Sequence, residues 1–113
     1  MSEKWIGMGV AIENPDVEMA LIMKLLCNED STTKEDFVGM MELQPEFHDE
    51  HGVVKFLYSP ITDVVFILSN PVPIGDEDVF STVDGDTTTL SHVMGDIGVD
   101  STVKAEFMYI ALP

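Results

Sequence analysis

The chain has 113 residues and combines 21 Asp and Glu with 5 Lys and no Arg, which gives a net charge of −16. Since 45% of its residues are hydrophobic, it differs from a disordered acidic tail, which lacks the apolar content to build a core. We expect a single folded domain over residues 1–113. The scarcity of basic residues argues against direct binding of nucleic acid or of anionic membranes.

The first predicted element is a strand over residues 4–13, because apolar and other side chains alternate along it. Gly7 and Gly9 share one face of this strand, where they would let another element pack closely. The Asn-Pro dipeptide at residues 14–15 has the form of an N-cap followed by N1, and it predicts a helix through about Cys27. Apolar residues surround almost the whole circumference of that helix, so we expect it to be deeply buried.

A second helix is predicted after a polar break in the sequence. Thr32, followed by Glu35 three residues later, fits a capping box, and Pro45 ends the helix. The sequence HDEHG at residues 48–52 is typical of a polar turn that ends at a glycine. Two helices therefore separate the first predicted strand from the next.

Two strands joined by a hairpin loop follow the turn. Residues 53–59 and 64–69 are rich in β-branched and aromatic side chains, and residues 60–63 form the loop. Because the second of these strands is continuously apolar, we expect it to lie centrally with both faces covered. Residues 70–75 contain two prolines and are predicted to be irregular.

The C-terminal part of the chain predicts a helix over residues 87–95 and a last strand over residues 103–112. The elements then follow the order β, α, α, β, β, α, β. With the first two helices taken as one crossover, this order fits the ferredoxin-like βαββαβ pattern. We therefore expect a small α+β domain in which an antiparallel sheet of about four strands carries the helices on one face.

The negative charge is concentrated in two acidic segments, residues 29–51 and 76–102, each with a net charge of −7. Both segments belong to predicted connections and helices, which would lie on one face or rim of the sheet. Concentrated charge of one sign repels itself, but it also attracts a strongly basic partner. An acidic face can instead serve only solvation or adaptation to salt. The predicted protein-binding residues are Glu29, Asp30, Glu35, Asp36, Glu42, Glu46, Asp49, Glu50, Asp76, Glu77, Asp78, Asp84, Asp86, Asp96 and Asp100.

Signals for catalysis, metals or cofactors are weak. His48 and His51 stand in an acidic turn that could hold a divalent metal, but no second ligand pair with zinc-site spacing follows. The run Asp84, Gly85, Asp86 does not continue with the ligand spacing of a calcium-binding EF-hand loop. No pairing of a nucleophile with a base can be argued either. We therefore predict a protein that is not an enzyme and uses no metal or cofactor.

These features favour a non-enzymatic binding protein whose acidic face occludes the basic nucleic-acid-binding surface of another protein. In size and charge, the chain is similar to the small acidic DNA-mimic inhibitors that phages and bacteria use against nucleases, restriction systems and repressors, although no motif is shared. The similarity implies a phage or bacterial anti-defence role, in which carboxylates imitate a phosphate backbone. The lack of a secretory signal or membrane helix favours the cytoplasm, or the host cytoplasm for a viral protein.

The alternative is an oligomeric structural or assembly module, such as a homodimer, whose acidity serves only solubility or the environment. Its candidate contacts lie on the neutral sheet and are Trp5, Tyr58, Tyr109 and the face that carries Gly7 and Gly9. The two hypotheses differ in their response to salt. Mimicry predicts binding that weakens as salt rises, whereas assembly predicts an oligomer that depends on concentration and tolerates moderate salt.

Overall fold

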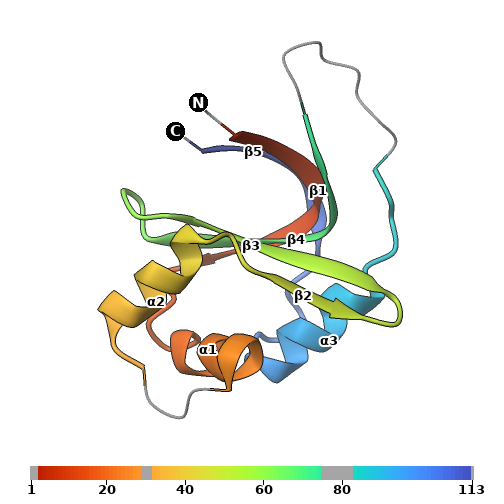
Figure 1. Ribbon diagram of the computed structural model, residues 1–113. Coiled ribbons are helices and arrows are strands. Elements are labelled where there is room, and N and C mark those ends of the chain that lie inside the picture. Colours follow the sequence, from red (N-terminus) through yellow and green to blue (C-terminus); the bar gives the residue numbers. More distant parts are fainter. Residues whose placement is uncertain (1–2, 29–31, 75–82, 113) are drawn as a thin grey trace.

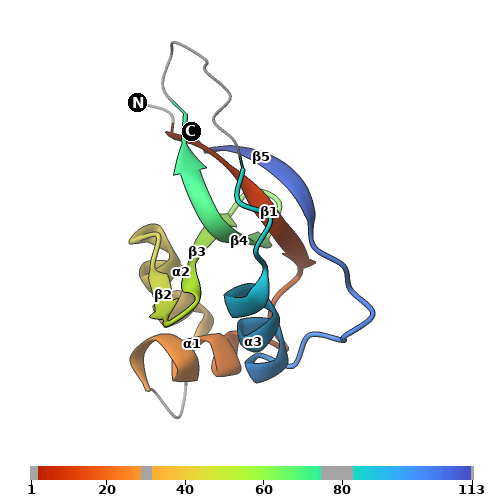
Figure 2. The same ribbon diagram turned by 90° about the vertical axis from the view of Figure 1, so that its right-hand side faces the viewer.

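The computed structural model describes residues 3–28, 32–74 and 83–112, and within them the chain forms five strands and three helices. In chain order, the elements are β1 (Glu3–Glu13), α1 (Met19–Cys27), α2 (Lys34–Glu42), β2 (Glu46–Asp49), β3 (Gly52–Ser59), β4 (Val64–Pro73), α3 (Thr88–Asp96) and β5 (Glu106–Leu112). The strands make one antiparallel sheet in the order β2-β3-β4-β1-β5 (Figure 1). The helices all lie on one side of this sheet, as the two views in Figures 1 and 2 show.

The main hydrophobic core lies between the helices and the sheet. Val10, Phe56 and Ile67 of the strands are almost fully buried there. Phe37 of α2 and Leu90 of α3 belong to the same cluster and cover it from the helix layer. Complete burial of a large apolar side chain contributes about 1.5–3 kcal/mol to stability. The burial of apolar side chains between the helices and the sheet is therefore the main contribution to the stability of the fold.

A second, smaller core lies on the opposite face of the sheet. Figure 1 shows that β1, β4 and β5 curl away from the helices, so that this face becomes concave. Leu57, Leu68 and Ile110 are buried in the hollow, and Trp5 packs against them. Both faces of the sheet therefore bury side chains. The helices cover one face, and on the other the curvature of the strands brings the side chains of the sheet into contact with one another.

Gly9 permits the close approach of β1 to β4 on this concave face. A Cβ atom at Gly9 would lie 2.5 Å from the carbonyl oxygen of Ile67 and 2.6 Å from a methyl carbon of Leu68. Real Cβ atoms do not approach other atoms so closely, which leaves glycine as the residue that fits. The expectation that the glycine face allows close packing is confirmed, and the element that packs there is β4.

The predicted α+β class is confirmed, but the ferredoxin-like arrangement is wrong. The sheet has an additional short strand, β2, which pairs with β3 and forms one edge among the described residues. It contains His48 and Asp49, which the sequence assigns to a turn, and the turn itself is confined to residues 50–51. Consequently, α1 and α2 carry the chain from β1 to the far edge of the sheet rather than to a neighbouring strand.

The central position of β4 is confirmed. Ile67 belongs to the main core and Leu68 to the second core, so both faces of this strand are covered, as its continuously apolar sequence predicts. The strand continues to Pro73, beyond its predicted end. A register shift between Ile6 and Met8 of the neighbouring β1 accompanies this extension. Such irregularities accommodate prolines that a regular ladder would exclude.

The first helix is shorter and less buried than its composition suggests. It begins at Met19, after a turn at residues 15–18. Only Ile22 and Met23 of α1 are buried, whereas Leu21 is 44% exposed and Val17, in the preceding turn, is 83% exposed. The prediction of deep burial is therefore wrong. The helix packs on the core through one side only, so apolar residues on its other sides stay partly exposed.

The second helix begins one residue later than the predicted capping box. Thr33, rather than Thr32, is the N-cap, and its Oγ1 accepts a hydrogen bond of 3.1 Å from the backbone N–H of Asp36. Thr33 has the extended backbone that a capping residue needs. The Thr32 hydroxyl is buried without a hydrogen-bond partner among the described residues.

The last helix and strand are confirmed with shifted boundaries, since α3 begins at Thr88 and β5 at Glu106. Strand β5 pairs with β1 along its length, from Gly9↔Glu106 to Glu3↔Leu112. The first strand of the chain therefore lies between β4 and β5, the last two strands. No helix in the described part of the chain has the length and apolar character needed to cross a membrane.

Candidate functional site

The two acidic segments meet where the β2–β3 turn packs against the start of α3. Oδ1 of Asp49, from the first segment, accepts a hydrogen bond of 2.6 Å from Oγ1 of Thr89 on α3. The same oxygen accepts hydrogen bonds of 2.8 and 3.1 Å from the backbone N–H groups of His51 and Gly52. These hydrogen bonds, above all the one from Thr89, lower the pKa of Asp49. Asp49 is therefore ionised at neutral pH.

Asp86, from the second segment, interacts electrostatically with Asp49. Its Oδ1 accepts hydrogen bonds from Thr88, at 2.6 Å from the hydroxyl and 2.9 Å from the backbone N–H, and these lower the pKa of Asp86. His51 lowers this pKa further, whereas the Asp49 carboxylate raises it. The carboxylates from the two segments are thus close enough to influence each other.

Hydrogen bonds from β4 fix the segment that precedes α3. The Ser69 hydroxyl donates to the carbonyl oxygen of Asp86 at 2.7 Å, and Nδ2 of Asn70 donates to the same oxygen at 3.2 Å. Nδ2 of Asn70 also donates to Oδ2 of Asp84 at 3.3 Å, while its Oδ1 accepts from the backbone N–H of Val53. The meeting point is called the acidic junction below, and its members are Asp49, Glu50, Asp84 and Asp86.

Two histidines lie at the acidic junction. The rings of His51 and His92 meet edge to face with 6.0 Å between their centroids. Nδ1 of His92 is 3.7 Å from Oδ2 of Asp49, and Nε2 of His51 is 3.5 Å from Oε1 of Glu50. His48 instead contacts a different carboxylate on β2. His48 and His51, the two histidines of the acidic turn, thus contact different carboxylates. Among the described residues, no group of three or more side chains could hold a metal ion.

The structure brings together only part of the predicted acidic surface. Phe37 of α2 contacts Tyr58 near the end of β3, whereas α3 is hydrogen-bonded beside the start of β3, so the two helices lie at opposite ends of the helix layer (Figure 1). The predicted residues that the structure places outside the junction are Glu35, Asp36 and Glu42 on α2, Glu46 on β2, Asp96 at the end of α3 and Asp100 in the loop after it. Five predicted residues lie outside the described part of the chain, namely Glu29, Asp30, Asp76, Glu77 and Asp78.

Lys34 forms a cluster that the sequence patterns did not indicate. Its Nζ lies 2.6 Å from Oδ1 of Asp16 and 2.9 Å from Oδ1 of Asp63. The Tyr58 hydroxyl donates to the same oxygen of Asp63 at 2.6 Å. The hydrogen bonds from Tyr58 and Lys34 lower the pKa of Asp63, and the two carboxylates raise the pKa of Lys34. This cluster connects the start of α2 to the β3–β4 loop. It also pairs Lys34, one of the few positive charges, with carboxylates of the protein itself.

Lys55 is a second lysine engaged within the fold. It lies on β3 and is only 7% exposed. Its Nζ donates to the carbonyl oxygen of Gln44 at 3.1 Å, and it lies 3.4 Å from Oε2 of Glu46. It also lies 4.7 Å from the centre of the Trp5 ring, within the range of a cation–π interaction. A single lysine inside an otherwise apolar strand is the sequence signal that could have revealed this buried charge.

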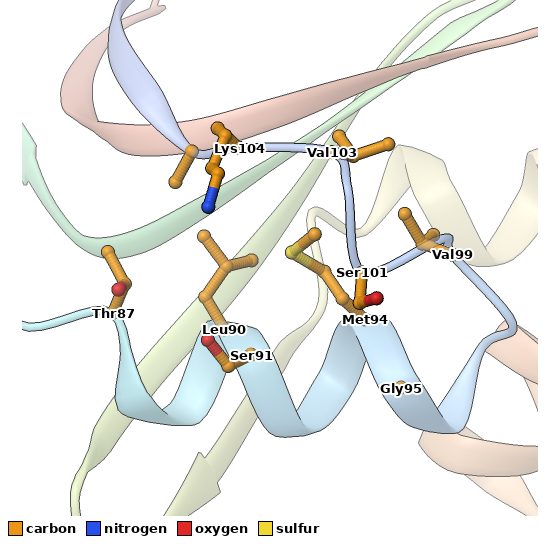
Figure 3. Close-up of a pocket in the computed structure, with 10 residues that line it drawn as sticks. Thr87, Leu90, Ser91, Met94, Gly95, Val99, Ser101, Val103 and Lys104 are labelled. Carbon is orange, nitrogen blue, oxygen red and sulfur yellow. The ribbon is translucent and has the colours of Figure 1, made fainter.

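A pocket of about 340 Å³ lies between α3 and the segment that leads into β5. Figure 3 shows Lys104 extending from that segment toward Leu90 of α3, with Met94 beside it. The pocket has no sequence signature, because its walls come from a helix and from an irregular connection.

Comparison with known proteins gave no match, whether with family models, curated proteins or solved structures. The chemistry of the acidic junction and of the pocket is therefore the basis for assigning a function.

Proposed function

We propose that this protein is a non-enzymatic acidic binding protein that occludes the basic nucleic-acid-binding surface of a target protein by DNA mimicry, in the manner of phage or bacterial anti-defence inhibitors. The observation that supports this most is the acidic junction, where carboxylates from two distant segments of the chain meet. A basic groove that normally holds a phosphate backbone is the surface that such a cluster complements. The partner is thus a protein rather than nucleic acid itself.

The rigidity of the junction supports the proposal. Thr89 and Thr88 hold the carboxylates of Asp49 and Asp86 in fixed positions. Groups that are already ordered lose less conformational entropy when they bind. The lowered pKa values of both acids keep them charged at neutral pH, where a phosphate backbone is also charged. Fixed position and permanent charge are the two properties that a phosphate mimic needs.

The distribution of positive charge supports the proposal as well. Lys34 and Lys55 are paired with carboxylates of the protein itself, away from the acidic junction. The net charge of −16 on a chain of this length therefore acts on the surroundings with little local compensation at the junction. Such a field accelerates encounter with a basic partner, and its effect weakens as salt screens the charges.

The test is a pull-down from nucleic-acid-depleted lysate of the source cell or its host, with the folded protein as bait and duplex DNA as competitor. We expect a nucleic-acid-binding protein to be captured and to be released by DNA and by salt. The double variant Glu50→Gln/Asp84→Asn removes two charges from the acidic junction and should capture less of it. The matched control Glu13→Gln/Glu106→Gln removes two exposed charges from β1 and β5 and should capture as much as the wild type.

Three results would contradict the proposal. Equal losses in the two double variants would assign binding to overall charge rather than to the acidic junction. Capture that duplex DNA fails to compete would show that the target is not held through its nucleic-acid-binding surface. Capture of no protein at low salt, by bait that circular dichroism shows to be folded, would contradict the proposal for that lysate.

A homodimeric assembly module is the second candidate function, and the edge of the sheet favours it. Within the described residues, β5 forms one edge, and its Phe107 and Tyr109 are 54% and 47% exposed. The other edge, β2, is only four residues long and lies beside acidic side chains. An edge with exposed apolar side chains is the kind that pairs with another chain, so β5 is the edge that a second copy would use.

The other contacts predicted for a homodimer are occupied within the fold. Trp5 packs in the second core, Tyr58 donates to Asp63, and Gly7 and Gly9 lie against β4. Tyr109 is the member of the predicted set that remains well exposed. A homodimer would therefore use the edge of the sheet and not the glycine face.

Sedimentation over a range of protein concentrations tests the homodimer. If β5 mediates assembly, the wild type should dimerise at moderate salt and Tyr109→Glu should be monomeric. Ile61→Glu is the matched control, because Ile61 is an exposed apolar residue in the β3–β4 loop. A wild type that stays monomeric at every concentration would reject this second candidate.

A further inference from the structure

The pocket between α3 and residues 99–105 has the size and lining of a small-molecule site. Its volume is about 340 Å³, near the lower end of the range of about 300–1,000 Å³ that is usual for ligand sites. Five apolar side chains line it, namely Leu90, Met94, Val99, Val103 and Ala105, together with the hydroxyl groups of Thr87, Ser91 and Ser101. Apolar side chains and hydroxyl groups both line the cavity, so it can contact an alkyl chain and a polar group of the same small molecule.

Lys104 provides the charge in this pocket. Figure 3 shows its ammonium group directed toward α3, above Leu90. Within the part of the chain that the structure describes, Lys104 makes no ion pair or hydrogen bond, whereas Lys34 and Lys55 are both paired with carboxylates. In a chain with 21 acidic residues, an ammonium group left without a carboxylate at a pocket is available to an anion from outside.

A second hollow on the other side of the same segment has the opposite charge. It has a volume of about 280 Å³ and shares Val99 and Val103 with the first pocket, but Glu13, Glu18 and Asp100 line it. Those carboxylates repel an anion, so an anionic ligand is directed to the pocket that contains Lys104. The two hollows also show that the segment before β5 packs loosely on both sides, which gives its side chains room to adjust around a ligand.

We propose that the pocket binds a small monocarboxylate with a short apolar body, such as hexanoate. The carboxylate accepts hydrogen bonds from the Lys104 ammonium group and from a neighbouring hydroxyl such as that of Thr87. The alkyl chain contacts Leu90 and Met94 of α3. One cation suits one negative charge, so the site favours a monocarboxylate over a more highly charged anion. This binding does not depend on the acidic junction or on the function proposed above.

Titration of the ¹⁵N-labelled full chain with hexanoate, followed by amide chemical shifts, tests the proposal. We expect saturable shifts concentrated in residues 87–105. Hexanamide has nearly the same shape without the charge, and it should bind roughly fivefold more weakly because it lacks the charge-assisted hydrogen bond. Acetate lacks the alkyl chain, and it should cause no saturable shift over the same concentrations.

Three variants separate the pocket from general effects of charge. Lys104→Met should lose the preference for hexanoate over hexanamide, and Lys104→Arg should retain it. Lys4→Met removes the same charge from β1 and should behave as the wild type. Hexanoate shifts outside residues 87–105, equal binding of the two ligands by the wild type, or a preference that persists in Lys104→Met would each overturn the proposal. Thermal unfolding of every variant confirms that it is folded.

Discussion

Gly9→Ala is the substitution that tests most directly how β1 packs against β4. The added Cβ would lie 2.5 Å from the carbonyl oxygen of Ile67 and 2.6 Å from Cδ2 of Leu68. Leu68 is fully buried in the second core, so it has little freedom to turn aside. The carbonyl belongs to the backbone of β4, which is paired with β1 on one side and with β3 on the other. Relief of the clash therefore requires part of the sheet to move.

The expected magnitude follows from two opposing effects. Overpacking of a closed core costs about 1–3 kcal/mol, and a clash with backbone lies at the top of that range. Alanine also restricts the unfolded chain more than glycine does, which offsets about 0.4–1 kcal/mol of the loss. We therefore expect Gly9→Ala to lower the free energy of unfolding by about 2 kcal/mol. For a domain of this size, that loss corresponds to roughly 8 °C in Tm.

Urea and thermal unfolding, followed by far-UV circular dichroism, measure this change. Gly39→Ala is the matched control, because a Cβ at this exposed position of α2 would meet no described atom within 4 Å beyond the backbone of its own helix. Alanine is the better helix former, so the control should gain about 0.5–1 kcal/mol in free energy of unfolding. A Gly9→Ala variant within about 0.5 kcal/mol of the wild type would refute the reasoning.

Four further substitutions test other parts of the structure. Asp49→Asn should lower Tm at neutral pH. Because the folded-state pKa of Asp49 is lowered, the advantage of the wild type should be complete above the unfolded pKa, about 4, and should vanish as the pH falls through the folded pKa. An advantage that stays constant from pH 7 to pH 2 would contradict this. Lys55→Met keeps the buried stem but removes the ammonium group from the ring of Trp5, so we expect a loss of about 1 kcal/mol in urea unfolding and altered emission from this single tryptophan. Unchanged emission would argue against the cation–π contact. Thr33→Ala should lose about 1 kcal/mol through the N-cap of α2, and Thr32→Ala should lose less; the reverse order would favour the capping box predicted from the sequence.

Periodicity located most of the strands because each of them buries at least one face. Alternation marked β1, and continuous apolar sequence marked β4 as a central strand. Strand β2 was not predicted, because four residues are too few to show a period of two and His48 and Asp49 are typical of turns. That one short strand changes the order of the sheet, and with it the fold.

The burial of α1 could not be predicted from composition. Hydrophobic residues around a whole helix indicate that every side can be buried, but they do not say what lies opposite each side. In the structure, Ile22 and Met23 face the core while Leu21 is partly exposed. Tertiary packing, which the local sequence does not encode, decided the outcome.

The acidic residues were identifiable from the sequence, but their meeting point was not. The hydrogen bond between Asp49 and Thr89 joins residues 40 positions apart. No local pattern predicts such a contact, since it depends on how the β2–β3 turn and α3 are placed by the rest of the fold. The same holds for the pocket lined by Lys104, which forms only where the segment before β5 lies beside α3.

The position of β1 between β4 and β5 has a consequence for the order of folding. Strand β1 leaves the ribosome before its partner β4 has been made, and its second partner, β5, follows later still. Pairing between such distant segments is slow, because a long loop must close first. We expect pulse-labelled hydrogen exchange to show protection in the β3–β4 hairpin before protection in β1, and simultaneous protection would contradict this order. During synthesis, the apolar side chains of β1 therefore lack these two partners until β4 and β5 have been made, and this exposes the strand to misassembly.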